Sequence, residues 1–439
     1  MFIIYDLIFL IFVLVYLPAY LFRRRFHRGF ARRLGILPPG LNLKRPIWIH
    51  AVSVGEAVTI KGLIEELRKI FPGKNFVIST VTPTGNKIAV RLAGEGDFVT
   101  YLPFDLSFIV KKLIKRINPA LFVIAETEIW PNLICALHTC GVPVVTVNGR
   151  ISDGSFKGYL AIKFLLKPIL DKVSLFCMQS ERDAARLSRL GVAQDKIKIT
   201  GNMKFDTAGF RMEAAQLIRC RQALGLGHSD KLLVCGSTHR REEEILLQLY
   251  RRLAQDFLGL KLLIAPRHPE RAGEIEGLIV KYGFKPMRLS RLDRPLDLAR
   301  GRQAPSIQAP SIQASGTVFI LDSVGQLVNY YAVADIVFVG GSLVNKGGHN
   351  ILEPAFLEKP ILFGPHMSNF HDIACLFIKT DAAIAVANQE ELENNIESLL
   401  SDPRRCLELG SRARGVILQN QGATIRNAQN LTQFCGIIG

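Results

Sequence analysis

The sequence predicts an α/β protein of two doubly wound domains, each a parallel sheet covered by helices on both faces. Two observations support this prediction. From Pro46 onward, short runs rich in Val, Ile and Phe alternate with stretches of helical length, and after residue 205 the alternation starts again. Near-continuous apolar strands are typical of sheets buried on both sides.

The first domain is predicted over residues 46–205. Its expected strands are 47–52, 75–80, 97–102, 120–126, 142–148 and 174–179. The helical stretches between and after them are 56–71, 84–92, 106–117, 129–139, 159–170 and 181–190. Each strand is followed by one helix, as a parallel sheet requires.

The second domain is predicted over residues 228–410, after a connector at 206–227. Its expected strands are 231–237, 260–266, 317–322, 335–341 and 359–364, and its helices are 240–257, 269–282, 324–331 and 351–357. A tandem APSIQ duplication at 302–316 is rich in Pro, Ser and Gln, so we expect a flexible surface insertion without a catalytic role. Two such domains imply a cleft at their strand ends.

The N-terminal segment predicts a membrane anchor. Residues 2–22 are apolar except for Asp6, and as a helix they span roughly 30 Å, the thickness of a bilayer core. The basic charge follows the apolar run instead of preceding it, which argues against a cleaved signal peptide. We therefore expect an uncleaved single-pass anchor at 1–22 and a basic juxtamembrane segment at 23–45, with the domains on the cytoplasmic side.

The net charge of +17 does not indicate a nucleic-acid-binding protein. Six arginines fall between residues 23 and 33, and no zinc-finger, RRM or basic-zipper pattern is present. An anionic membrane surface explains the excess, and an acidic membrane-embedded substrate explains it equally well. Eight scattered cysteines without a CxxC pair indicate reduced thiols rather than disulfides or a zinc site.

Two polar glycine corners lie at strand ends of the second domain. In "GGSLVNKGGHNILEPA", Gly348 precedes Asn350, a good N-cap, and Glu353 falls three residues later. These residues fit either a capping-box variant or a site where loop N–H groups hold a phosphate and Glu353 binds ribose hydroxyls. The second corner, "CGSTH", places Gly236, Ser237, Thr238 and His239 between strand and helix, as turn residues or as part of a phosphate site.

Further candidates follow other strands. Arg267 and His268 of "APRHPER" stand where a phosphate fork is expected. In the first domain Glu56 lies at a helix start, where it either complements the helix dipole or acts as a base that the dipole keeps ionised and weak. Glu126 and Glu128 follow another strand. Separate carboxylates facing one cleft are costly unless they bind cations or hydroxyls.

These segments together resemble the Kdo transferases, which move 3-deoxy-D-manno-oct-2-ulosonic acid (Kdo) from CMP-Kdo to lipid A precursors at the inner membrane. The matching runs occur in order over nearly the whole chain. They are "SVGE", "TPTG", "YLPFD", "ETEIWPN", "NGRIS", "GNMKFD", "GSTHRREEE", "PRHPER" and "FVGGSLVNKGGHNILEPA". The resemblance implies a GT-B architecture of two Rossmann-like domains, with a last helix, within 411–439, that crosses back.

The resemblance also implies roles for individual residues. Glu56 looks like the general base, Glu126 like the second essential carboxylate, and Glu128 like a further one. The CMP site would hold Arg267 with its neighbour His268, the Gly236–His239 corner, and Gly348, Asn350 and Glu353. Inversion at the anomeric carbon needs one base and no strong acid, and Arg150 or Lys204 is expected to hold the Kdo carboxylate. No DxD-like or His/Cys cluster is present, so no metal and no cofactor are expected.

Two alternatives remain open at this point. Another GT-B enzyme of envelope synthesis, using a UDP-sugar and a lipid-linked acceptor, would share both glycine corners. A membrane-tethered nucleotide-binding or nucleic-acid-binding protein without catalysis would explain the anchor and the charge, but it leaves Glu56 and Glu126 without a purpose.

Overall fold

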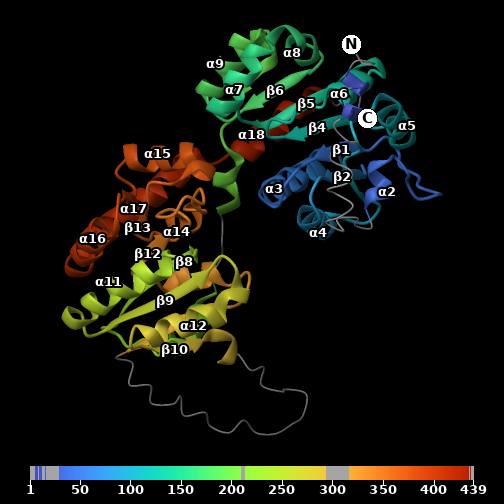
Figure 1. Cartoon of the computed structure of the whole chain (residues 1–439). Helices are drawn as coiled ribbons and strands as arrows, with labels where there is room; N and C mark the ends of the chain where they lie inside the picture. The colour runs from blue at the N-terminus through green and yellow to red at the C-terminus, as the bar shows by residue number, and fades with distance from the viewer. Residues whose placement is uncertain are drawn as a thin grey trace, which may run out of the picture. The chain divides into compact units, whose positions relative to one another are not determined.

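The computed structural model describes residues 5–7, 9–11, 15, 29–208, 213–292, 316–434 and 436. The chain divides into two units. Unit 1 comprises Met1–Thr207 and Asn420–Gly439, and unit 2 comprises Ala208–Gln419. The last twenty residues thus belong to the same unit as the N-terminal half of the chain (Figure 1).

Unit 1 contains a parallel sheet of seven strands in the order β3-β2-β1-β4-β5-β6-β7. The strands are β1 (Ile47–His50), β2 (Phe76–Thr80), β3 (Phe98–Tyr101), β4 (Leu121–Ala125), β5 (Val144–Gly149), β6 (Leu175–Met178) and β7 (Ile197–Ile199). In the register, Ile47 of β1 pairs with Phe76 on one side and Leu121 on the other. The sheet is doubly wound, as the sequence predicts.

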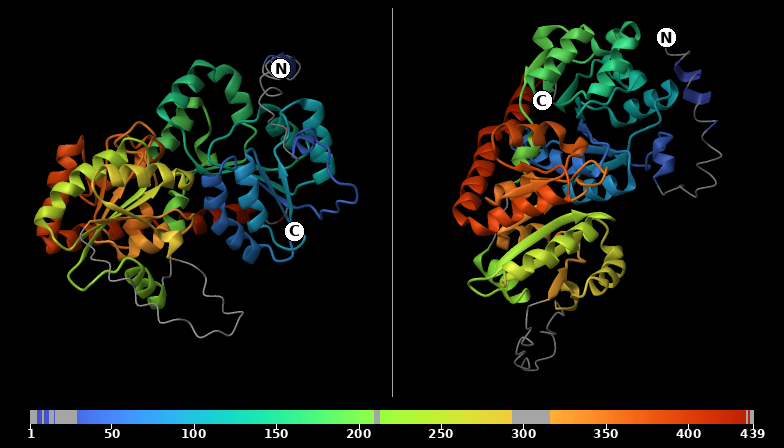
Figure 2. Two further views of the ribbon diagram at one scale, coloured as in Figure 1. Left: turned by 60° about the horizontal axis from the view of Figure 1, so that its bottom comes forward. Right: turned by 60° about the vertical axis from the view of Figure 1, so that its left-hand side comes forward.

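Two cores pack on the two faces of this sheet, because successive side chains of a strand point to opposite faces. Trp48 and Phe122 belong to one core, and their rings meet edge to face with centroids 4.7 Å apart. Ile47 and Ile49 belong to the other core. All four side chains are fully buried. Apolar residues at every strand position are therefore required, and helices cover both faces (Figure 2).

The helices of unit 1 follow the strands. They are α2 (Phe30–Arg33), α3 (Val54–Ile70), α4 (Pro83–Leu92), α5 (Ser107–Ile117), α6 (Pro131–Thr139), α7 (Asp153–Ala161), α8 (Lys163–Leu170), α9 (Glu181–Leu190) and α18 (Ala423–Leu431). The helix expected over 159–170 is in fact two helices, since the chain breaks at Ile162.

Helix α18, from the C-terminal end, packs against α3 and β5 (Figure 1). Its Asn427 is buried; the side chain donates to the Thr200 hydroxyl at 3.0 Å and accepts from the Asn148 amide. The Asp206 carboxylate accepts from the amides of Gly422 and Thr424, both at 2.6 Å. These bonds fix the returning helix beside the end of β5.

Unit 2 repeats the architecture with a parallel sheet in the order β10-β11-β9-β8-β12-β13-β14. Its strands are β8 (Lys231–Thr238), β9 (Leu260–Pro266), β10 (Lys285–Arg288), β11 (Thr317–Ile320), β12 (Ile336–Val339), β13 (Ile361–Phe363) and β14 (Ile384–Ala385). Its helices are α10 (Ala214–Ala223), α11 (Glu242–Asp256), α12 (Ala272–Lys281), α13 (Leu327–Val333), α14 (Leu352–Phe356), α15 (His371–Lys379), α16 (Gln389–Ser401) and most of α17 (Pro403–Asn420).

The strands that the sequence analysis does not predict are β7, β10 and β14. All three lie at sheet edges. Edge strands are short and partly polar, because one side has no neighbour and polar residues there discourage further pairing. β7 reads Ile-Lys-Ile, β10 contains Pro286, and β14 has two residues. Their composition therefore carries little strand signal.

Other segments differ from expectation or lie outside the described residues. The expected connector, 206–227, contains helix α10. The APSIQ insertion, 302–316, lies outside the described residues except for Gly316. Most of the expected anchor, 1–22, also lies outside them, and within the part of the chain that the structure describes no helix is long and apolar enough to cross a membrane.

The described ends of the N-terminal segment contact unit 1. The Asp6 carboxylate accepts from the Ser107 amide at 3.0 Å and from the Asn132 side chain at 2.6 Å. Two of the six basic-segment arginines also pack on the unit: Arg32 donates to the Val99 carbonyl, and Arg33 donates to the Val81 carbonyl. The basic segment, 23–45, is therefore partly built into unit 1.

Candidate active site

The strand orders place one crevice in each unit. A doubly wound sheet opens where the chain winds in opposite directions from its first strand, and ligands bind at the carboxyl ends of the strands there. In unit 1 the first strand, β1, lies between β2 and β4, so the crevice is beyond β1 and β4. In unit 2 the first strand, β8, lies between β9 and β12. The sequence-predicted residues follow these same strands.

Glu56 lies in the first turn of α3, just after β1. One carboxylate oxygen accepts from the Val52 amide at 2.7 Å, and the other accepts from the Ser53 hydroxyl at 2.8 Å. Ser53 is the N-cap, so the capping interpretation holds structurally. Burial nevertheless raises the pKa of Glu56, against the expectation that the helix dipole keeps this carboxylate a weak base. A raised pKa makes it a better proton acceptor.

Glu126 directly follows β4 and adopts a left-handed backbone with φ of +59°. Non-glycine residues in this region are uncommon, and they concentrate at functional sites. One Glu126 carboxylate oxygen lies 3.1 Å from the Lys204 ammonium. Lys204, which we expected to hold the donor carboxylate, therefore pairs with Glu126 in this structure.

Glu128 shares the crevice with the other two glutamates. Burial raises the pKa of Glu128 to about 7, and the charges of Glu56 and Glu126 raise it further. Lys204 is near enough to lower the pKa of Glu56. Three carboxylates and one ammonium thus form a single electrostatic cluster in unit 1. Coupled carboxylates of this kind, with the pKa values of Glu56 and Glu128 raised, are suited to accepting a proton from a hydroxyl.

Arg150, His50 and Trp130 also lie at this end of unit 1. Arg150 follows β5, where its backbone amide donates to the Thr127 hydroxyl at 2.9 Å. The buried His50 ends β1, and its ring lies edge to face with Trp130 at 6.4 Å. Sequence reasoning did not single out His50, because a histidine inside an apolar strand looks like a core residue.

The corner residues Gly236–Thr238 form the end of β8 and serve packing more than the sequence suggests. A Cβ on Gly236 would lie 1.8 Å from the Tyr331 hydroxyl, so glycine is required for this aromatic contact. Ser237 has a left-handed backbone with φ of +57°. Thr238 is fully buried, and its hydroxyl donates to Glu243 at 3.0 Å. Arg271 donates to the same carboxylate at 2.9 Å.

The loop after β12 is held by Glu242, a residue that sequence reasoning missed. This buried carboxylate accepts from the amides of Gly341, Ser342 and Leu343 at 2.7, 3.0 and 3.0 Å. It also accepts from the His239 amide at 2.9 Å. Three amides at the start of the loop that we expected to hold a phosphate are therefore already occupied by a side chain.

Asn350 and Glu353 lie together at the start of α14. The Asn350 side chain donates to Glu353 at 3.0 Å, and its oxygen accepts from the Leu352 amide at 3.1 Å. Burial raises the pKa of Glu353. Gly348 has φ of +68°, and a Cβ there would lie 2.2 Å from the Met367 sulfur. The N-cap of α14 is Ile351, without a side-chain cap bond, and Glu353 accepts from the Asn350 side chain instead of its backbone amide. The capping-box interpretation is therefore wrong, and the Glu353 carboxyl remains a candidate for hydroxyl binding.

Histidines gather at the same edge of unit 2. The Nε2 atoms of His239 and His349 lie 2.9 Å apart. The exposed His268 follows β9, with its ring centroid 6.0 Å from that of His239. Arg267 is also exposed, and its charge lowers the pKa values of both His239 and His349. Within the described ranges no group of three His, Cys, Asp or Glu side chains could hold a metal ion.

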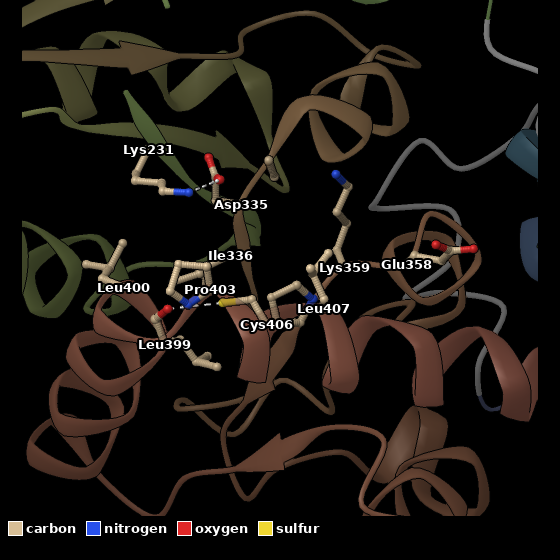
Figure 3. A pocket seen from close by; sticks show the side chains of 12 residues that line it. Lys231, Asp335, Ile336, Glu358, Lys359, Leu399, Leu400, Pro403, Cys406 and Leu407 are labelled. Carbon is tan, nitrogen blue, oxygen red and sulfur yellow. Dashed lines mark hydrogen bonds and ion pairs between the residues drawn. The ribbon is translucent and has the colours of Figure 1, made fainter. Parts of the chain in front are cut away.

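A pocket of about 310 Å³ lies elsewhere in unit 2 (Figure 3). It is lined by Lys231, Asp335 and Ile336, at the amino ends of β8 and β12. Lys231 and Asp335 form an ion pair across it at 3.0 Å. Because all strands of the sheet are parallel, this pocket is at the edge opposite the histidines. Ligands of open parallel sheets bind at the carboxyl ends, so the crevice beyond β8 and β12 remains the candidate site.

The two parallel seven-stranded sheets, each with a polar cluster at its crevice, define a GT-B-like protein. A solved structure of a glycosyltransferase from Rickettsia africae has this fold: it aligns with a TM-score of 0.56 at 16% identity, over 90% of this chain and 99% of that one.

Sequence comparison identifies the family. The model of the 3-deoxy-D-manno-octulosonic-acid transferase (kdotransferase) family matches residues 28–207. A 3-deoxy-D-manno-octulosonic acid transferase of Haemophilus influenzae is 33% identical, covering 93% of this chain and 90% of its own length. Another, of Chlamydophila psittaci, is also 33% identical, over 84% and 82% respectively. The chain belongs to the Kdo transferase family.

Proposed function

We propose that this Kdo transferase takes its sugar from CMP-Kdo and transfers it, with inversion, to a hydroxyl of a lipid A precursor in the synthesis of the lipopolysaccharide inner core. The observation that carries the proposal is the carboxylate cluster in unit 1. A hydroxyl nucleophile needs a base, and the leaving CMP needs cationic or hydrogen-bonding groups rather than a strong acid. Unit 1 offers the base, and unit 2 offers histidines and arginines.

Glu56 is the proposed base. It accepts the proton of the acceptor hydroxyl while the bond from that oxygen to the anomeric carbon forms and the bond from carbon to the phosphate oxygen breaks. Glu126, neutralised by Lys204, orients the acceptor, and Glu128 holds a proton that keeps the cluster from carrying three charges. In unit 2, Glu353 and Asn350 are proposed to bind the ribose, and Arg267 the phosphate.

A transfer assay tests this function. Wild type and Glu56→Ala are incubated with tetra-acylated lipid A precursor and radiolabelled CMP-Kdo generated in situ, and the products are resolved by chain length. We expect labelled product from wild type and a loss of about 100-fold or more in Glu56→Ala with CMP binding unchanged. Glu65→Ala, an exposed change on the same helix, is the matched control.

The product ladder also counts the Kdo units that are added. A wild-type protein that is inert with CMP-Kdo, yet binds a UDP-sugar and transfers it, would replace this proposal with a different GT-B glycosyltransferase.

We further propose that residues 1–22 attach the enzyme to the inner membrane by a single pass, with both units on the cytoplasmic side. The apolar run, the six following arginines and the membrane-embedded acceptor support attachment. The contact of Asp6 with Ser107 supports a first turn that stays beside unit 1 instead. Labelling of Ile3→Cys by an impermeant thiol reagent from the periplasmic side distinguishes these two arrangements. Reaction with the reagent supports a segment that crosses the membrane. Protection supports a segment that lies along the cytoplasmic face.

A further inference from the structure

Several amides of the loop after β12 are already satisfied within the fold. The Glu242 carboxylate accepts from Gly341, Ser342 and Leu343, and the Gly348 amide donates to the Gly341 carbonyl at 2.8 Å. These amides are therefore not free to bind a nucleotide phosphate, and we consider the side chains at this edge of the sheet instead. The side chains grouped there are His239 and His349.

The two imidazoles form a hydrogen-bonded pair. Their Nε2 atoms lie 2.9 Å apart, and their ring planes are within 3° of parallel. A nitrogen-to-nitrogen hydrogen bond contains one proton, so one Nε2 donates and the other accepts. If the accepting ring is protonated at Nε2, two N–H groups point at each other. The observed geometry thus requires one Nε2 without a proton, and protonation of this accepting Nε2 breaks the pair.

The pair is built into the fold. The Glu242 carboxylate holds the His239 backbone amide, as it holds the loop that leads to His349. Gly341 leaves room for both rings, since a Cβ there would lie 2.9 Å from a His349 carbon and 3.3 Å from a His239 carbon. Any side chain at position 341 would press on the pair, and its φ of +67° also favours glycine.

The surroundings disfavour a proton on the empty pair. Burial lowers the pKa of His349 to about 4, with a further contribution from Arg267. Burial also lowers the pKa of His239, followed by the charges on the facing groups, which are His268, Lys346, Arg271 and Arg267. The one facing carboxylate that bonds near the pair, Glu242, is engaged with backbone amides. An anion bound among these cations would instead favour protonation of the pair.

We propose that the His239–His349 pair is a proton-linked phosphate contact, in which binding of the nucleotide's phosphate is accompanied by uptake of one proton from solvent and opening of the pair. This inference rests on the proposed function, which supplies the nucleotide. The imidazolium then donates to the phosphate oxygen that gains charge when CMP leaves, and the proton returns to solvent when CMP is released. No covalent bond of the protein changes.

Calorimetry of CMP binding measures the proton directly. Titrations in buffers of different ionisation enthalpy, at about pH 7.5 where a phosphomonoester is mostly a dianion, give the number of protons bound per CMP. We expect uptake of close to one proton for wild type and for the control His228→Gln, an exposed histidine outside the cluster. His349→Gln should take up almost none, and cytidine, which lacks the phosphate, should cause no uptake.

Nitrogen-15 spectra of histidine-labelled wild type provide a readout that needs no variant to fold. We expect two neutral rings in the free protein, one protonated at Nε2 and one at Nδ1, and one imidazolium after CMP is added. If CMP binds and both rings stay neutral without proton uptake, this inference is wrong and the proposed function stands. If CMP does not bind and UDP does, the proposed function fails, and this inference falls with it.

Discussion

The Lys204 ammonium lies 3.1 Å from the Glu126 carboxylate, at the crevice where Glu56 and Glu128 also gather. The pair joins residues that are far apart in the sequence of unit 1 and places one positive charge among three carboxyl groups. Its partial burial weakens solvent screening, so the ion pair affects its neighbours more than an exposed one would. Lys204 is therefore a group that sets the charge of the cluster.

Replacement of Lys204 by Met should shift the pH dependence of transfer. Lys204 lowers the pKa of Glu56, so its removal raises that pKa further, and the base is ionised only at higher pH. We expect the acid limb of the kcat/KM profile to move to higher pH. At a pH below that limb, kcat/KM should fall about tenfold relative to wild type. Lys198→Met, an exposed change on β7, is the control. An unshifted acid limb with a uniformly lower rate would show that Lys204 acts in binding alone.

Glu242→Gln should destabilise unit 2. The amide has one oxygen where the carboxylate has two, so several of the four backbone amides that Glu242 satisfies lose their acceptor. Unsatisfied buried donors cost roughly 1–3 kcal/mol each, and we expect a loss of about 3 kcal/mol or more. Urea unfolding measures this change in the free energy of unfolding. The exposed neighbour Glu244→Gln should be neutral, and equal stability of both variants would contradict the anchoring role.

Gly236→Ala should be costly for a packing reason. The added methyl would meet the Tyr331 hydroxyl at 1.8 Å, and overpacking of this kind costs roughly 1–3 kcal/mol. Gly277→Ala in α12 meets nothing within 4 Å and should raise the stability, since alanine favours helix. Thermal melting of both variants decides the matter. If Gly236→Ala melts like wild type but loses CMP affinity, Gly236 is a ligand-approach glycine after all.

The buried His50 should make the free energy of unfolding depend on pH. Burial lowers the pKa of His50 from its ordinary 6.5 to about 4, so between these values the unfolded chain binds a proton that the folded chain does not. Stability therefore falls as pH falls through this window, by about 3 kcal/mol for this group when the window is crossed. The unfolding free energy of His50→Gln should show a weaker pH dependence than wild type. Identical slopes would mean that His50 titrates normally when folded.

The periodicity of apolar runs predicted the strands between β1 and β6 and most of unit 2, because central strands buried on both faces leave a continuous apolar signal. Glu56 and Glu126 were found because each follows such a strand. Glu242 was missed, since three consecutive acids at a helix start are typical of a solvated first turn. His349 was passed over as part of a glycine loop, and only the return of that loop to β8 brings it to His239.

The order of most elements, the two parallel sheets and the family can be read from the amino-acid sequence, since they depend on local patterns and on motifs that occur together along the chain. The folded structure shows which polar groups are already hydrogen-bonded within the protein and which remain for a ligand. The side chains of Glu242 and Thr238 are hydrogen-bonded within the protein. Burial raises the pKa of Glu128 to about 7, and the charges of Glu56 and Glu126 contribute to this shift. Hydrogen-bond partners and desolvation arise only when the strand ends meet at the crevice, so no linear pattern contains them.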